Sequence, residues 1–224
     1  MFLRTRSKSG FYGHFFMIRF WKGKLPETVL ITPVGAVFKR ITARSSKVRH
    51  IGLSPWYPSA ACSSGGREFA VINCGRGESA GDCVLFLKNE AVKEILFFGF
   101  AGSINPAFKQ GELCSLAGYG GGAGFTQFIK ERSALKIRSA VKATRQEKGL
   151  KEAYVYTIPS LFMEPALHAH IHSKGYDLID METAHIAAAG KGVKLRFIYY
   201  ISDLFLAFRK INMDRIADIC LKSV

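Results

Sequence analysis

No apolar run in this 224-residue sequence approaches the roughly 20 residues that a helix needs to cross a bilayer. The most apolar stretch, EILFFGFAGSI, is interrupted by Gly99 and Gly102. The beginning of the sequence also lacks the uninterrupted apolar segment of a secretory signal. These absences argue against a protein with membrane-spanning helices and against a secreted one, and they predict a soluble, cytoplasmic protein.

Paired cysteines are missing as well. The five cysteines, at positions 62, 74, 83, 114 and 220, are odd in number and never occur as C-x-x-C. A disulfide framework or a zinc site is therefore not expected, and buried free thiols are. His168 and His172 would share one face of a helix, but no third ligand accompanies them, so no metal is predicted.

Acidic residues are almost absent from the first 50 positions, where eleven Lys and Arg accompany the single acid Glu27. Residues 51–224 carry twenty-one Lys and Arg against sixteen acids, so most of the net charge of +15 belongs to the N-terminal part. Residues 1–24 mix cations with Phe, Tyr and Trp, which is typical of a poorly ordered basic arm or of an upstream extension of a gene that starts at Met17. Contact of this arm with an anionic membrane surface is the alternative, and a nucleic-acid partner is not expected.

The remaining chain, residues 25–224, is predicted to form one domain of the α/β class. Several runs are continuously apolar and rich in β-branched or aromatic residues, as in strands that are covered on both faces. Helical patterns alternate with many of them, which favours a parallel or mixed sheet. The predicted strands are 28–34, 67–75, 94–102, 112–118, 153–159, 177–182 and 195–202, and the predicted helices are 78–92, 127–149 and 182–192. Residues 53–66 are predicted to be a connection or a hairpin, and the glycine-rich residues 118–124 are predicted to be a loop.

Polar groups and glycines follow four of the predicted strands. The segments are INCGRGES, FGFAGSI, IDMETA and YISD. In open α/β sheets, ligands gather where strands end and helices begin, so these segments are candidates for one binding site. Taken singly, each has a structural explanation: a tight turn for the glycines, a favourable first-turn carboxylate for Glu182 and a helix cap for Asp203.

Together and in this order, the segments resemble the superfamily of purine nucleoside phosphorylases, uridine phosphorylases and methylthioadenosine/S-adenosylhomocysteine nucleosidases. NCGRGESAGDC resembles the glycine turn after the family's second strand, and FFGFAGSINPAFKQGELC is similar to its Gly-(Ser/Thr)-x-Gly signature. TIPSLFMEP resembles the segment whose phenylalanine stacks on the base. IDMETAHIAAAGKGVKLRFIYYISD matches the family's Glu-Met-Glu-Ala…Ser-Asp block almost position by position. The resemblance covers roughly residues 67–206.

This resemblance implies a three-layer α/β/α sandwich around a twisted mixed sheet, and a reaction that cleaves the N-glycosidic bond of a nucleoside, most simply a purine nucleoside that could be 5'-modified. Such a bond breaks through an oxocarbenium-like transition state. The roles that the resemblance implies are these: Asp203 as the acid for the leaving base and Ser202 orienting it; Glu182, Met181 and Asp180 around the ribose; Phe162, Ala101 and Gly102 around the base.

The attacking group is not settled by these motifs. Phosphorylases carry a phosphate-binding arginine just before the Gly-(Ser/Thr)-x-Gly turn, and here Phe97 and Phe98 occupy that neighbourhood, which favours the nucleosidases, which use water. Those hydrolases carry an N-terminal glutamate that activates the water, and the segment LITPVGAVFKRI has none. It offers Gly35, Lys39 and Arg40 instead, which together with Arg76 could hold phosphate.

Hydrolysis of a nucleoside is therefore the first hypothesis. A phosphate-dependent phosphorylase, with phosphate as co-substrate, and a non-catalytic nucleoside-binding member of the fold are the alternatives. No cofactor is implied. Because members of this superfamily are commonly dimers or hexamers, a homo-oligomer is expected.

Overall fold

The computed structural model describes residues 20–122, 124, 141–142, 149–160, 164–204 and 211–224. The strands are β1 (Thr28–Thr32), β2 (Lys47–His50), β3 (Ser59–Ser64), β4 (Arg67–Asn73), β5 (Glu94–Ser103), β6 (Leu113–Gly121), β7 (Val141–Lys142), β8 (Lys151–Thr157), β9 (Leu178–Asp180) and β10 (Lys194–Leu204). The helices are α1 (Gly35–Arg44), α2 (Glu78–Leu87), α4 (Glu164–His172), α5 (Thr183–Ala189) and α6 (Met213–Ser223). None of these helices is both long and apolar enough to cross a membrane.

All of these strands belong to one mixed sheet, which confirms the predicted sheet type. Five pairings close part of it into a ring, in the order β5, β10, β6, β8, β9 and back to β5. On the edge of β5 opposite β10, the first residues of β5 pair with β1 and the last ones with β9. From β1 the sheet continues through β4, β3 and β2 as an open wing. Strand β5 therefore belongs to both parts, and β10 pairs with it in parallel along its whole length.

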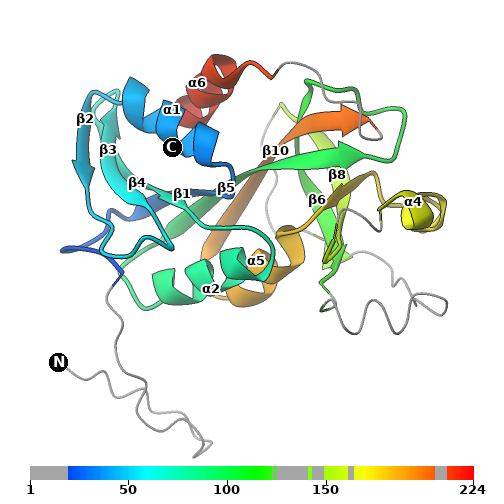
Figure 1. The fold of residues 1–224 in the computed structure, drawn as a ribbon, viewed down its shortest axis with the longest axis horizontal. Coiled ribbons are helices and arrows are strands. Elements are labelled where there is room, and N and C mark those ends of the chain that lie inside the picture. Colours follow the sequence, from blue (N-terminus) through cyan, green and yellow to red (C-terminus); the bar gives the residue numbers. More distant parts are fainter. Residues whose placement is uncertain (1–19, 123, 125–140, 143–148, 161–163, 205–210) are drawn as a thin grey trace, which may run out of the picture.

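Helices cover both faces of this sheet (Figure 1). On one face α1 and α6 pack together over a core that contains Leu30, Leu96 and Phe98. On the other face α2 and α5 pack together over a core that contains Ile31 and Phe97. Alternate residues of β5 thus enter different cores, as the two-residue period of a strand requires. The predicted three-layer architecture is confirmed.

Some sequence predictions of local structure were confirmed and others were wrong. In the segment 53–66, predicted to be a connection or a hairpin, the hairpin is observed, because β3 pairs antiparallel with β4 across the turn at Gly65–Gly66. The predicted glycine loop at 118–124 begins as strand, because β6 continues through Gly121 beside β8. A Cβ atom at Gly121 would lie 2.1 Å from the carbonyl oxygen of Thr157, so only glycine permits this pairing. The predicted helix at 127–149 lies mostly outside the described residues, and where it can be checked, at Val141–Lys142, the chain is a strand.

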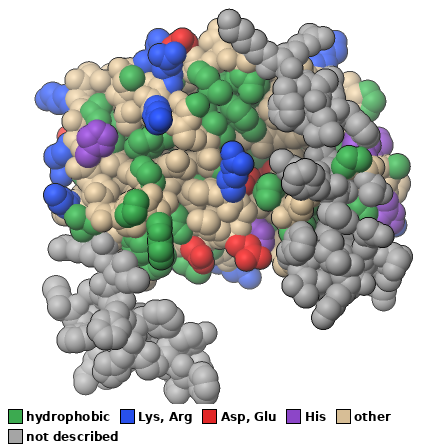
Figure 2. All heavy atoms as spheres, in the orientation of Figure 1, with side chains coloured by type: hydrophobic (Ala, Val, Ile, Leu, Met, Phe, Trp, Pro, Cys, Tyr) green, Lys and Arg blue, Asp and Glu red, His purple; other side chains and the backbone are tan. Residues whose placement is uncertain are grey.

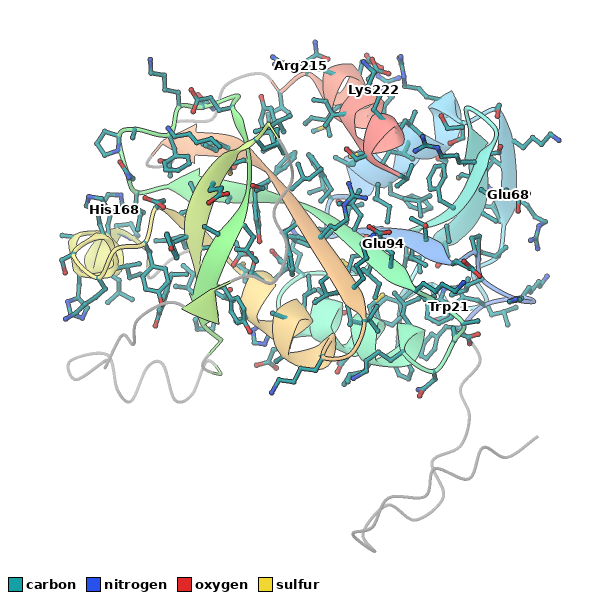
Figure 3. The ribbon with its side chains drawn as sticks, turned by 180° about the vertical axis from the view of Figure 1, so that it is seen from behind. Trp21, Glu68, Glu94, His168, Arg215 and Lys222 are labelled. Atoms are coloured by element: carbon teal, nitrogen blue, oxygen red, sulfur yellow. The ribbon has the colours of Figure 1, made fainter. Side chains whose placement is uncertain are left out.

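The end of the predicted basic arm belongs to the folded body. Phe20 and Trp21 are buried, and Phe20 packs against the rings of Tyr57 and Phe86. Trp21 Nε1 donates a 2.9 Å hydrogen bond to Ser59 Oγ, and Trp21 lies against the body of the domain in Figure 3. The domain therefore begins by Phe20 rather than at residue 25, and residues 1–19 lie outside the described residues. On the face shown in Figure 2, the Lys and Arg side chains are scattered and do not form one basic patch.

We expect Trp21→Ala to lower the free energy of unfolding by about 3–5 kcal/mol, because it removes a buried indole and leaves Ser59 without its donor. Urea unfolding followed by circular dichroism would measure the loss. Trp56→Ala is the matched control, since the Trp56 side chain is 73% exposed and its removal should cost less than about 0.5 kcal/mol. Equal losses in the two variants would contradict the assignment of Phe20 and Trp21 to the core.

Candidate active site

The candidate site lies where neighbouring parallel strands end. Thr32 at the end of β1 is in register with Asn73 at the end of β4, and the N–H of Cys74 donates a 3.0 Å hydrogen bond to the carbonyl of Thr32. The segment after β1 therefore runs beside the glycine turn after β4. A Cβ atom at Gly35, the first residue of α1, would lie 3.4 Å from the side chain of Asn73.

The glycine turn after β4 contacts Glu182 directly. Gly75 and Gly77 have φ values of 71° and 59°, in the region that favours glycine. This conformation directs the N–H of Gly77 toward Glu182 Oε1, to which it donates a 2.9 Å hydrogen bond. Gly77 and Glu182, which are 105 positions apart, are thus joined by a hydrogen bond. The sequence motifs predicted that their two segments would lie in one common site.

Glu182 is a buried carboxylate whose ionisation is finely balanced. Its side chain is 5% exposed. Burial and then the charge of Asp180 raise the pKa of Glu182 to about 7, while the N–H of Gly77 and the charge of Arg76 lower it. The carboxylate is therefore available near neutral pH as a strong, buried acceptor for hydroxyl groups.

Asp180, two residues before Glu182, accepts hydrogen bonds from other residues of the protein. Its Oδ1 accepts a 2.7 Å hydrogen bond from Thr157 Oγ1. Its Oδ2 accepts bonds from the N–H and the hydroxyl of Thr183. Thr183 Oγ1 lies 2.6 Å from the hydroxyl of Tyr199. Burial raises the pKa of Asp180, against the hydrogen bonds from Thr183 and Thr157, which lower it.

Thr157, Thr183 and Tyr199 were not identified from the sequence. Thr183 directly follows Glu182 as the first residue of α5, so its place in the IDMETA segment was a signal that could have been used. Thr157 and Tyr199 come from β8 and β10, and nothing in their local sequence distinguishes them from other buried strand residues.

The ends of β5 and β10 form the second part of the site. Gly102 is in register with Asp203 on one side and with Ile179, next to Asp180, on the other. The backbones of Ile179 and Asp203 are therefore two strand spacings apart, about 10 Å. Ser202 is buried and its Oγ donates to the carbonyl of Ala101 over 3.5 Å, while the side chain of Asp203 lies outside the described residues. A β-bulge between Ile201 and Asp203 interrupts the ladder at this point.

The remaining predicted residues are placed unevenly. Met181 is half-buried, and its carbonyl oxygen lies 3.9 Å from where a Cβ of Gly77 would be, so Met181 adjoins the glycine turn. Arg76 is exposed in that turn and acts electrostatically on Glu182. Lys39 is exposed on α1 and forms no ion pair among the described residues. Phe162 lies outside the described residues.

Phe97 occupies the position before the glycine signature and belongs to the core. It is 1% exposed and its ring contacts those of Phe197 and Tyr199, with centroids 5.8 and 5.9 Å away. Phe100 stands at the Ser/Thr position of the signature and packs against Tyr200. Neither position offers a polar group to an anion.

One surface cavity, of about 700 Å³, is lined by residues 24–28 and by residues of β2, β3 and β4 at the amino end of β1, away from these residues. A second cavity, of about 600 Å³, is lined by residues 109–113, Lys151 and Arg215. It adjoins the end of β10, because Gln110 in its lining donates a hydrogen bond to the carbonyl of Ser202. We place the candidate site at the strand ends, because the buried carboxylates and the glycine turn converge there. Among the described residues, no group of three or more His, Cys, Asp or Glu side chains could hold a metal ion.

Comparison with known proteins decides the family. The model of the phosphorylase superfamily matches residues 57–218, a segment that includes the glycine turn, Glu182 and Asp203. The chain belongs to the phosphorylase superfamily. Its matched segment extends the sequence resemblance at both ends and confirms it.

Two solved structures illustrate the similarity of this superfamily member to known proteins. The 5'-methylthioadenosine/S-adenosylhomocysteine nucleosidase of Campylobacter jejuni has a TM-score of 0.68 and 13% identity, with 88% of this chain and 97% of that chain covered. The purine nucleoside phosphorylase of Toxoplasma gondii, in complex with immucillin-H, has a TM-score of 0.68 and 17% identity, with 89% and 90% covered. At these identities the likeness establishes the fold. No curated protein matches this superfamily member.

Proposed function

We propose that this protein cleaves the N-glycosidic bond of a purine nucleoside, with water as the attacking group. The observation that carries the proposal is the buried Glu182 carboxylate, which follows β9 and accepts a hydrogen bond from the N–H of Gly77 in the glycine turn after β4. A carboxylate at such a place suits the 2'- and 3'-hydroxyls of a ribose, because charge-assisted hydrogen bonds are about twice as strong as neutral ones.

Cleavage develops positive charge on the sugar and leaves electrons on the base. In this proposal, Glu182 fixes the ribose, Met181 packs beneath it and Phe162 stacks on the base. Asp203 protonates or hydrogen-bonds N7 of the purine, and Ser202 orients Asp203. Ala101 and Gly102 border the base. General acid catalysis of this kind contributes about 10²–10⁴-fold to a rate.

Two aromatic residues, one before the glycine signature and one within it, favour water as the attacking group. Phe97 is buried against the rings of Phe197 and Tyr199, and Phe100 stands where the family has a hydroxyl residue, so neither supplies a partner for phosphate. The competing observation is Arg76, whose charge acts on Glu182 from the glycine turn and which would favour phosphate. The first turn of α1 contains no acidic residue that could activate water, and this favours the third candidate, a protein that binds nucleosides without cleaving them.

A panel of purine nucleosides, including 5'-modified ones, assayed for free base with and without inorganic phosphate, tests these candidates. We expect base release at the same rate in both conditions. Release that requires phosphate would overturn water as the attacking group. Thermal stabilisation by nucleosides with no base release in either condition would support the binding protein and overturn cleavage.

A further inference from the structure

Asp180 is already engaged by donors from the protein. An ionised carboxylate offers about four lone-pair sites. Three hydrogen bonds reach Asp180, from the hydroxyl of Thr157 and from the N–H and the hydroxyl of Thr183. Asp180 is also buried, with 3% exposure. A ribose hydroxyl could therefore reach Asp180 only if the protein around this carboxylate moved.

We propose that Asp180 is a positioning residue, which holds the backbone of Glu182 and Thr183 so that the Glu182 carboxylate faces the substrate. This inference rests on the proposed function, and it replaces the direct ribose contact that the sequence resemblance implied for Asp180. Two features of the network support it, namely the elements that it joins and the charges that surround Glu182.

The network ties Glu182 to two strands of the ring. Thr157 donates to Asp180 from β8, and its Oγ1 accepts a 2.9 Å bond from the N–H of Ala184 in α5. Because Thr183 already donates its hydroxyl proton to Asp180, the hydroxyl of Tyr199 from β10 must be the donor to Thr183 Oγ1. The first two residues of α5, Thr183 and Ala184, are therefore both hydrogen-bonded to residues of other elements, and Glu182 directly precedes them.

The charges around Glu182 are few, so the effect of Asp180 can be isolated. Asp180 on β9 and Arg76 in the glycine turn are the charged groups that act on Glu182. Cys74 and Tyr199 also face it electrostatically, but burial raises the pKa of each well above its ordinary value, so both are neutral near pH 7. Asp180 is thus the acidic neighbour whose charge raises the pKa of Glu182.

Three variants test the positioning role. Thr183→Val removes the hydroxyl and keeps the shape of the side chain, and Thr183→Ser restores the hydroxyl. Asp180→Asn keeps the shape but removes the charge and replaces one of the two acceptor oxygens with an NH2 donor. We expect kcat/KM at pH 8.5 to fall about 10- to 100-fold in Thr183→Val and Asp180→Asn, mainly through kcat, and to recover in Thr183→Ser. In Asp180→Asn, the acid limb of the pH profile should also move down by about one unit. A rise in KM confined to Asp180→Asn, with Thr183→Val unaffected, would show a direct ribose contact and overturn the proposal.

A measurement without substrate separates this inference from the proposed function. The amide proton of Gly77, followed by nuclear magnetic resonance, reports its hydrogen bond to Glu182 Oε1. We expect this resonance to move upfield in Asp180→Asn and Thr183→Val, and to stay in place in Thr183→Ser and in the exposed control Asp82→Asn. An unchanged Gly77 resonance in both Asp180→Asn and Thr183→Val would overturn the positioning role. If the resonance moves but no nucleoside is cleaved by the unmodified protein, only the proposed function fails.

Discussion

Glu182→Gln is expected to lower kcat/KM for nucleoside cleavage by about 10²–10³-fold. The amide keeps the size of the side chain but replaces a charged acceptor with a neutral one. Hydrogen bonds to charged groups contribute about 1.5–3 kcal/mol each, and two ribose hydroxyls would lose that assistance as the sugar becomes positive. Steady-state base release measures the loss. Glu78→Gln is the matched control, because Glu78 is exposed in the first turn of α2, and its activity should equal that of the unmodified protein.

The pH dependence gives this prediction a second readout. Since the pKa of Glu182 is about 7, kcat/KM should fall tenfold per pH unit below about 7 and level off above it. Glu182→Gln should abolish this limb. An unchanged acid limb in Glu182→Gln, or undiminished turnover, would remove Glu182 from the ribose site.

Glu182→Gln should lower activity but raise the free energy of unfolding above pH 7. The pKa of Glu182 is raised on folding, so the stabilisation from its bound proton is fully present below the ordinary pKa of 4.5 and is lost as the pH rises through about 7. Above pH 7, Glu182→Gln should therefore be more stable than the unmodified protein, by an amount on the order of a few kcal/mol. A variant that is less active and more stable has not lost its activity through misfolding.

Asp203→Asn is expected to lower the rate of purine release by about 10²–10⁴-fold, the usual contribution of a general acid. An amide has no proton to give to the leaving base. Asp82→Asn, an exposed change on α2, is the control variant and should leave the rate unchanged.

The leaving group sharpens the test of Asp203. A 4-nitrophenyl riboside departs without protonation, so Asp203→Asn should cleave it nearly as well as the unmodified protein does. Equal losses on the purine nucleoside and on the nitrophenyl riboside would show that Asp203 supports the site in another way. Full activity on both would exclude it from the chemistry.

Much of the fold was predictable because its central strands carry strong local signals. Strands β5 and β10 were predicted within two residues of their observed ends, since continuous apolar runs are typical of strands that are covered on both faces. Strand β2 was missed because all four of its residues are exposed and give no pattern. Helix α1 was missed because only Val37, Phe38 and Ile41 of its ten residues are buried.

The polar residues of the candidate site could be identified from the sequence, but the residues that hydrogen-bond to them could not. The segment from Asp180 to Glu182 was identified because its polarity interrupts an apolar region and matches a family pattern. Thr157, which donates to Asp180, comes from β8, and Tyr199, which is hydrogen-bonded to Thr183, comes from β10, so only the folded chain brings this network together. Phe20 and Trp21 were assigned to the arm on charge, whereas their rings contribute to the core because burying aromatic surface is more favourable than leaving it in water.

The ring of strands makes the site depend on the last third of the chain. Ala101 and Ile201 are paired although 100 positions separate them, and Gly102 is shared between β9 and β10. A fragment that stops before Lys194 would leave one edge of β5 without its eleven-residue partner, β10. The N–H and C=O groups of that edge would be exposed, and chains aggregate on edges of this kind. A truncation that removes β10 thus removes Ser202 and Asp203 together with the strand that protects β5, so loss of the chemistry and loss of solubility would come from the same cut.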